Sequence, residues 1–154
     1  MTFHLTGSLR RGFTAIEIII VMVIIGIMSA VALPFIRNAT VKSGVSGALA
    51  AITSLHAVAR NSAIQRGRTA VLVLNASTNT VVVVLQRPGS TTAVDTVGKA
   101  ENLYTRFGVT LSTTNSQVSF NPRGIGASSN TTVIVTRSGY ADTLVISAAG
   151  RLLR

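Results

Sequence analysis

The sequence predicts an α+β protein in which one long N-terminal helix packs on an antiparallel β-sheet domain with two sheets. A continuous apolar run extends from Phe13 to Leu33, and apolar residues then recur at helical spacing as far as Arg66. From Thr69 onwards, short runs rich in valine, isoleucine and threonine are separated by glycine, proline and asparagine. One helical region followed by a series of strands is typical of the α+β class.

The apolar run has 21 residues and a single charge, Glu17. About 20 apolar residues suffice to cross the hydrocarbon core of a membrane as a helix. Three interpretations of this run compete. It is an ordinary membrane anchor, or a secretory signal with Arg10 and Arg11 before it and a cleavage site at Ala30-Val31-Ala32, or a segment exposed by removal of a leader peptide after Gly12.

Glu17 favours the third interpretation. A carboxylate near the middle of a bilayer costs about 2.5–3.5 kcal/mol, so it needs a partner or a function. Cleavage between Gly12 and Phe13 creates an amine four residues before Glu17, on the same face of a helix. A carboxylate in the first turn also complements the helix dipole. In an assembly of such helices, Glu17 could instead pair with the amine of a neighbour.

The string Gly12-Phe13-Thr14-Ala15-Ile16-Glu17, with the aliphatic run and Pro34 after it, resembles the N-terminus of the type IV pilin and type II secretion pseudopilin superfamily. Ala15 departs mildly from the leucine that is usual at its position. Two further segments, "FNPRG" at 120–124 and "LVISAAGR" at 144–151, resemble the C-terminal pattern of the GspH/FimT branch. The resemblance is firm over residues 10–36 and thin from Pro88 to Val118.

This resemblance implies a pilin-like fold and a division of the chain into a leader peptide (1–12), a transmembrane and assembly helix (13–36), an amphipathic helix (37–66) and a β-sheet head (67–154). Prepilin peptidase would cut after Gly12, and Phe13 would be N-methylated. Glu17 would set the register of assembly, and Pro34 would kink the helix.

The resemblance also implies the location and partners of a minor pilin or pseudopilin. The chain would cross the bacterial inner membrane once, with its C-terminal domain periplasmic, and would join other pilins or pseudopilins through an inner-membrane assembly platform. Charge alone does not orient it, because Arg10 and Arg11 on one side are balanced by Arg37 and Lys42 on the other. Both a secretion pseudopilus and a type IV pilus use this N-terminus.

After Pro34, one apolar stripe predicts that the helix continues and covers a domain. Its members are Val41, Val45, Leu49, Ile52, Leu55, Ala59 and Ala63. Gly67 is expected to cap the helix, and Gly44 and Gly47 are expected to loosen it. We interpret His56, near the stripe, as a satisfied residue between core and surface and not as a ligand.

The β-rich part predicts strands at Thr69–Leu74 and Thr80–Gln86, joined by a loop at Asn75–Asn79. Both strands are apolar on both faces, so we expect the helix to cover one face and a second sheet the other. Residues 87–111 read as a looser stretch with turns. Further strands are expected at 116–120, 131–137 and 142–148, with a turn at Ser138–Ala141 and a short edge strand within 150–154.

No catalytic constellation is visible, and we expect neither an enzyme nor a cofactor or metal site. Cysteine is absent, which excludes thiol chemistry, and His4 and His56 are the only histidines. Asp95 and Glu101 could bind calcium in a loop, but two acids six residues apart are more often solvated charges.

The region beyond Phe35 is strongly basic, with twelve Lys/Arg against Asp95, Glu101 and Asp142, or 12 − 3 = +9. Such a charge suits phospholipid headgroups, acidic proteins or nucleic acid, or serves solubility alone. One basic cluster, Arg60, Arg66 and Arg68, lies near the helix end.

An alternative function is a DNA-binding minor pilin of a transformation pilus. DNA-uptake members of the FimT branch carry a C-terminal Gly-Arg-x-Arg, which Gly150–Arg154 resembles with one residue too many. In a strand this insertion places Arg154 on the opposite face from Arg151, so DNA contact through this element lacks support.

Overall fold

The computed structural model describes residues 12–90 and 93–154, which form two compact units, one ending at Asn38 and one spanning Ala39–Arg154. The expected leader, with Arg10, Arg11 and His4, lies outside the described residues except for Gly12. The unit that begins at Ala39 contains the second half of a long helix and all the strands.

Helix α1 spans Ala15–Arg66, 52 residues with Pro34 inside it. At its start the Glu17 amide donates to the side-chain oxygen of Thr14 over 3.3 Å, which satisfies one of the free amides of the first turn. At its end Gly67 has φ +59°, and the Arg68 amide donates to the Ala63 carbonyl over 3.2 Å. This closing hydrogen bond and left-handed glycine confirm Gly67 as the cap.

The predicted apolar stripe is confirmed, because Val45, Leu49, Ile52, Ala59 and Ala63 are all buried. The expected loosening at Gly44 and Gly47 is wrong, since α1 is unbroken there. A side-chain carbon at Gly44 would meet the Arg137 guanidinium and lie 3.0 Å from the Phe107 carbonyl oxygen. At Gly47 it would lie 2.9 Å from the Phe107 ring. Glycine therefore lets the head approach the helix closely.

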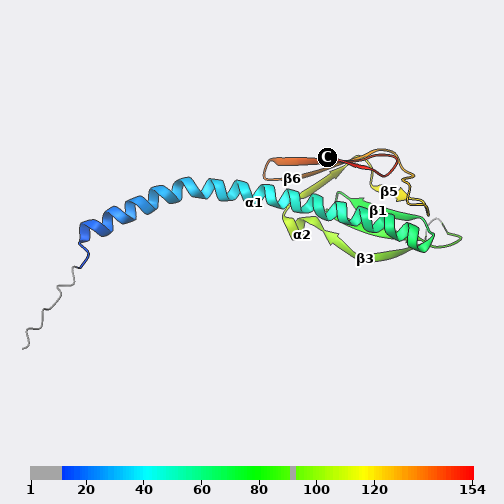
Figure 1. The fold of residues 1–154 in the computed structure, drawn as a ribbon, viewed down its shortest axis with the longest axis horizontal. Helices are drawn as coiled ribbons and strands as arrows, with labels where there is room; N and C mark the ends of the chain where they lie inside the picture. The colour runs from blue at the N-terminus through cyan, green and yellow to red at the C-terminus, as the bar shows by residue number, and fades with distance from the viewer. Residues whose placement is uncertain (1–11, 91–92) are drawn as a thin grey trace, which may run out of the picture. The chain divides into compact units, whose positions relative to one another are not determined.

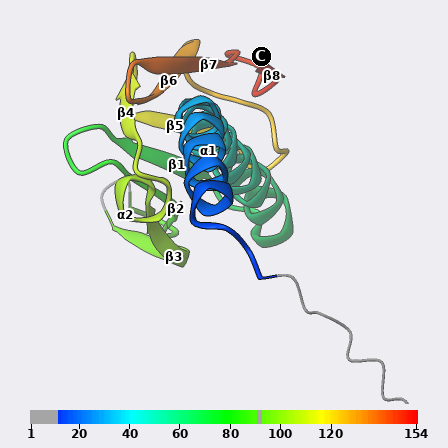
Figure 2. The same ribbon diagram turned by 90° about the vertical axis from the view of Figure 1, so that its left-hand side faces the viewer.

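Two antiparallel four-stranded sheets lie alongside the second half of α1 (Figures 1 and 2). The first sheet has the order β3-β2-β1-β5, and the second β4-β6-β7-β8. The strands are β1 (Ala70–Asn75), β2 (Thr80–Gln86), β3 (Val94–Asn102), β4 (Thr110–Thr113), β5 (Gln117–Phe120), β6 (Thr131–Arg137), β7 (Tyr140–Ile146) and β8 (Leu152–Leu153). The predicted fold, one long helix on two antiparallel sheets, is confirmed.

The expected looseness of residues 87–111 is wrong. The segment holds β3, the short helix α2 (Leu103–Phe107) and the start of β4. β3 is an edge strand in which only alternate residues are half-buried, and its register with β2 shifts between Val81 and Val83. Because such a strand needs few apolar residues, its sequence resembles a loop. Asn102 ends it and caps α2 by accepting the Thr105 amide over 2.9 Å.

One core joins α1 to both sheets, and Phe120 is its largest completely buried side chain. On β1, Ala70, Leu72 and Leu74 are completely buried. On the opposite face of that strand, Val71 is buried and Val73 is half-buried. The expectation that β1 is covered on both faces therefore holds in full for one face and only in part for the other.

Candidate functional site

The N-terminal part of α1 presents a bare apolar surface. Every residue from Gly12 to Thr40 is exposed, including Phe13 and the aliphatic side chains after it. Among the described residues, α1 is the one helix long and apolar enough to cross a membrane. Glu17 is exposed in its first turn, the only acidic residue there. An exposed apolar surface of this size is typical of a segment that contacts a membrane or another protein.

His56 lies at the centre of a second feature, where α1 meets the C-terminal end of the chain. Its ring stands edge-on to the Phe120 ring, with centroids 5.0 Å apart and an interplanar angle of 84°. The ring also makes a hydrogen bond to the Gly150 backbone. Burial lowers the pKa of His56, and the nearby Arg60 lowers it further. The expectation of a satisfied histidine is wrong at Nε2, which is buried without a partner.

Three glycines bring the "FNPRG" and "SAAGR" segments against α1 and against each other. A side-chain carbon at Gly124 would lie 2.6 Å from Ile64 Cδ1. At Gly126 it would overlap the Ala148 carbonyl oxygen and lie 2.6 Å from the Gly150 nitrogen. At Gly150, where φ is +78°, it would lie 2.9 Å from the Phe120 ring. The two motifs noticed in the sequence therefore form one interlocked corner of the head.

An open groove of about 620 Å³ lies at this corner, and we call it the basic groove. It is lined by His56, Ala57, Arg60, Asn61 and Ile64 on α1, and by Gly150, Arg151 and Leu152 on the C-terminal segment. Its two charges are both positive.

The two C-terminal arginines lie in different surroundings. Arg151 lines the basic groove, whereas an Arg154 guanidinium nitrogen lies 2.5 Å from Asp142 Oδ2. This ion pair also lowers the pKa of Asp142. β8 comprises only Leu152–Leu153, so both arginines lie outside it, and the expectation that a strand places them on opposite faces stays a prediction.

The basic cluster near the helix end is also divided. Arg60 lines the basic groove, and Arg66 lies in the last turn of α1. Arg68 instead donates to the Gln86 carbonyl over 2.7 Å and to Asp95 over 3.0 Å. Arg87 binds the other oxygen of Asp95 over 2.7 Å, and these two arginines lower the pKa of Asp95.

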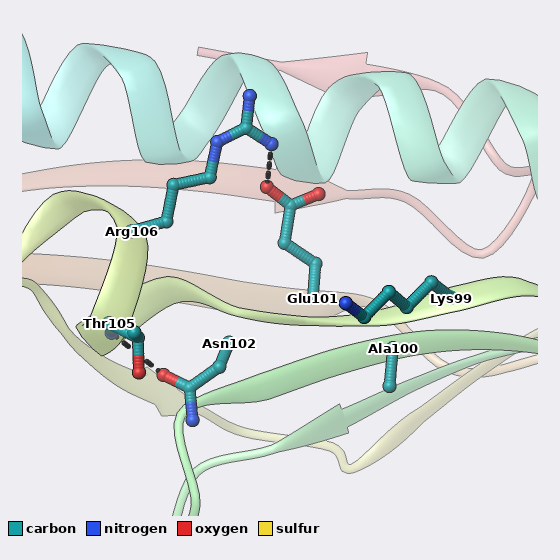
Figure 3. A pocket seen from close by; sticks show the side chains of 6 residues that line it. All are labelled: Lys99, Ala100, Glu101, Asn102, Thr105 and Arg106. Carbon is teal, nitrogen blue, oxygen red and sulfur yellow. Dashed lines mark hydrogen bonds and ion pairs between the residues drawn. The ribbon is translucent and has the colours of Figure 1, made fainter.

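A further hollow of about 480 Å³ lies where β3 meets α2 (Figure 3). Two pairs of its polar groups already bind one another, because the Arg106 guanidinium pairs with Glu101 and Asn102 accepts the Thr105 amide at the cap of α2. Asp95 and Glu101, considered above for calcium, are thus both held by arginines. Within residues 12–90 and 93–154, no three histidine or acidic side chains gather as a metal site would require.

The sequence model of the family described as type II transport protein GspH matches residues 48–150. The chain belongs to this family. Its GspH-family region includes the α1 stripe from Leu49 onwards, the "FNPRG" motif, the "LVISAAGR" motif except Arg151, and all strands except β8. The expected membership of the pilin and pseudopilin superfamily, in its GspH branch, is confirmed.

Two solved structures share the fold of this GspH-family chain. The type IV minor pilin FimU of Pseudomonas aeruginosa has a TM-score of 0.54 at 17% identity, covering 70% of this chain and 90% of its own. The minor pseudopilin EpsH of the Vibrio cholerae type 2 secretion system has a TM-score of 0.54 at 12% identity, covering 70% and 91%. No curated protein sequence is significantly similar to the chain.

Sequence reasoning missed the residues that bring the head onto α1. Gly44, Gly47 and Gly126 were not assigned a packing role, and Phe107 and Arg137 were not connected to the helix. Arg137 donates to the Thr40 carbonyl over 3.4 Å, across 97 positions of sequence. The alanines of the α1 stripe, Ala59 and Ala63, were a sequence signal for this packing, because small side chains on one helix face let another segment pack close to the helix.

Proposed function

We propose that this chain is a minor pilin or pseudopilin subunit, made with a leader that prepilin peptidase removes between Gly12 and Phe13. The new N-terminus at Phe13 is then methylated. The subunit waits in the bacterial inner membrane, anchored by residues 13–36 with its head periplasmic, until the assembly platform draws it into a filament with other subunits. The observation that carries this proposal is the bare apolar start of α1, with Glu17 as its only charge, on a chain of the GspH family.

Glu17 is the residue proposed to guide assembly. It follows Phe13 by four positions, so the amine freed by cleavage and the carboxylate lie on one face of the helix. Within a lipid environment a carboxylate strongly favours a counter-charge. A neighbouring subunit that offers its N-terminal amine to Glu17 supplies that charge at one axial position only. The pairing therefore fixes the register between subunits.

The first test is the intact mass and N-terminal sequence of the protein purified from its native membrane. We expect a chain that begins at Phe13 and carries one N-methyl group. A chain beginning at Leu33 would identify an ordinary secretory signal cut after Ala32, and the filament proposal would then be abandoned.

The second test replaces Glu17. Glu17→Ala should give a correctly processed subunit that stays in the membrane and is missing from sheared filaments, because the counter-charge for the neighbour's amine is gone. Glu17→Asp, which keeps the charge on a shorter stem, should assemble better than Glu17→Ala. Equal assembly of Glu17→Ala and the unchanged chain would refute the role of this carboxylate.

DNA binding, the alternative suggested by the net charge, gains no support from the C-terminal arginines, because Asp142 holds Arg154 while Arg151 faces the basic groove. We therefore do not include it in the proposed function.

A further inference from the structure

The positive charges of the basic groove have no negative partner within the head. Its three carboxylates are already bound: Asp95 by Arg68 and Arg87, Glu101 by Arg106, and Asp142 by Arg154. Neither Arg60 nor Arg151 takes part in an ion pair among the described residues. Both arginines line the same groove, which is lined by no acidic residue.

His56 adds a polar group without a partner to this groove. The residue is 5% exposed, its Nε2 atom makes no hydrogen bond, and its ring is held by Phe120 and the Gly150 backbone. Buried polar atoms in native proteins nearly always have a partner, so an unpartnered one on a residue that lines the groove marks this corner as unusual.

The groove is also firmly built. The Ser147 amide donates to the Arg151 carbonyl over 2.8 Å, and the Arg151 amide donates to Ser147 Oγ over 3.0 Å. Gly150 and Gly126 interlock directly beneath this turn. On the opposite wall, the Arg60 stem lies against the turn at Gly124, where an added side-chain carbon would be 3.4 Å from Arg60 Cγ. Preorganised cations lose less freedom on binding than free side chains do.

Apolar surface accompanies the charges. Ile64 is 50% exposed at one end of the groove, and Ala57 and Leu152 line it. A ligand that matches this wall carries negative charge next to aliphatic groups.

We propose that the basic groove is a docking site for an acidic polypeptide segment of a partner protein, whose carboxylates bind Arg60 and Arg151 while its aliphatic side chains cover Ile64 and Leu152. Arginine is well suited to this task, because its fork of donors matches a carboxylate. The proposal concerns a surface of the head and does not depend on leader removal or on filament formation.

Charge and position favour a protein over nucleic acid or a membrane. A nucleic-acid backbone binds through several cations in a row, and single strands add aromatic stacking, whereas this groove offers two arginines and Phe120 is completely buried. Arg60 also lies 21 residues beyond the start of its unit at Ala39, about 30 Å along the helix at 1.5 Å per residue. With residues 13–36 as the membrane anchor, as proposed above, the groove lies well along α1 from the lipid headgroups.

The experiment is a titration of the full chain, in zwitterionic detergent micelles, with the peptide acetyl-Leu-Glu-Glu-Leu-amide. The chain carries ¹³C-labelled histidine, and a His4→Gln variant assigns the remaining signal to His56. We expect the peptide to shift the His56 signal in a saturable manner. The glutamine analogue, acetyl-Leu-Gln-Gln-Leu-amide, should produce no saturable shift, and its binding as strongly as the acidic peptide would overturn the proposal.

Matched variants test which cations act. Arg60→Gln and Arg151→Gln should each weaken binding about 3-fold to 5-fold, as expected for partly exposed ion pairs. Arg66→Gln lowers the net charge equally but lies outside the groove, so it should leave the affinity unchanged. A similar loss in all three variants would show attraction to net charge alone and would refute a specific site.

Proton linkage gives a second readout. His56 faces Arg60 from α1, Arg151 and Gly150 from the C-terminal segment, and the uncharged Phe120 ring from β5. A bound carboxylate offsets these positive charges, so the pKa of His56 should rise when the acidic peptide is present. No change in that pKa at saturation would show that the carboxylates bind elsewhere.

Two competitors complete the test. If inorganic phosphate displaces the peptide at equal concentration, the groove is a simple anion site and the docking proposal fails. If a duplex oligonucleotide at physiological salt binds more tightly than the peptide, and Arg60→Gln weakens that binding, the ligand is nucleic acid and the proposal fails as well.

Discussion

Replacing Gly126 by alanine should loosen the interlocked corner of the head. The new carbon would lie 2.6 Å from the Gly150 nitrogen and closer still to the Ala148 carbonyl oxygen, whereas an ordinary contact begins at 3.4 Å, so the two segments must separate by at least about 0.8 Å. Both obstacles, the Ala148 carbonyl oxygen and the Gly150 nitrogen, belong to the backbone and cannot rotate away. Overpacking of this kind costs about 1–3 kcal/mol. Separation also breaks the Gly126 amide bond to the Ala149 carbonyl, already 3.4 Å long and worth about 1 kcal/mol at most. We expect a total loss of about 3 kcal/mol.

Gly139→Ala is the matched control. Gly139 has φ +81° in the tight turn between β6 and β7, and an added carbon there would meet nothing within 4 Å. Its cost is the backbone strain alone, about 1 kcal/mol. The loss of chain freedom in the unfolded state is the same for both substitutions and cancels.

Hydrogen exchange of the full chain in detergent measures the difference. The amides of β6, a central strand with Val133 and Val135 completely buried, report opening of the whole head. A difference of about 2 kcal/mol between the variants corresponds to about 30-fold faster exchange in Gly126→Ala. Equal exchange in the two variants would refute the argument that backbone contact at Gly126 holds the corner together.

Three other outcomes follow from the structure. Stability should fall as pH drops below about 6.5, since the unfolded chain protonates His56 more readily than the folded head, whose pKa for this group is lowered by burial. A second loss of stability should begin near pH 4, because arginines lower the pKa values of Asp95 and Asp142 in the folded head and these groups bind protons on unfolding. Thermal unfolding measured across pH checks both losses. If the loss below pH 6.5 persists in His56→Gln, its assignment to His56 is contradicted. Gly47→Ala should stabilise the head by about 1 kcal/mol in a Phe107→Ala background, because alanine favours a helix more than glycine does and no ring then opposes the new methyl group. When the Phe107 ring is present, the same substitution should stabilise the head much less, because the ring contacts that methyl group. Chemical denaturation of the four chains measures this coupling, and an equal gain in both backgrounds would show that the ring does not restrict Gly47.

The sequence was sufficient for elements whose apolar pattern matches their burial. The α1 stripe and the strand β6 were predicted because their buried side chains recur at the helix and strand periods. β3 was missed for the opposite reason, since an edge strand with half-buried alternate positions carries threonine, lysine and glutamate as a loop does. The spacing of apolar residues therefore predicts a helix or strand only where that element buries one face completely.

The basic groove could not be predicted from the sequence, because its residues are brought together by long-range packing. Arg60 and Arg151 are 91 positions apart in the sequence. The residues around the C-terminus do not show that Asp142 forms its ion pair with Arg154 and not with Arg151. His56 was recognised as lying near the apolar face, but its unpartnered nitrogen depends on Gly150 and Phe120. Gly12 and Glu17 could be proposed from the sequence alone, because the proposed leader cleavage and membrane anchoring both concern one contiguous segment.

The edge strands of the two sheets affect how the heads of several subunits behave when they are crowded together. Three of the four edge strands are very short, with four residues in β4, four in β5 and two in β8. The fourth, β3, has nine residues, but its pairing with β2 slips and Gly98 takes φ +75° next to the cation of Lys99. Short or irregular edges offer a poor template for another strand. Heads packed side by side at very high local concentration therefore meet through side chains, without fusing their sheets into an aggregate.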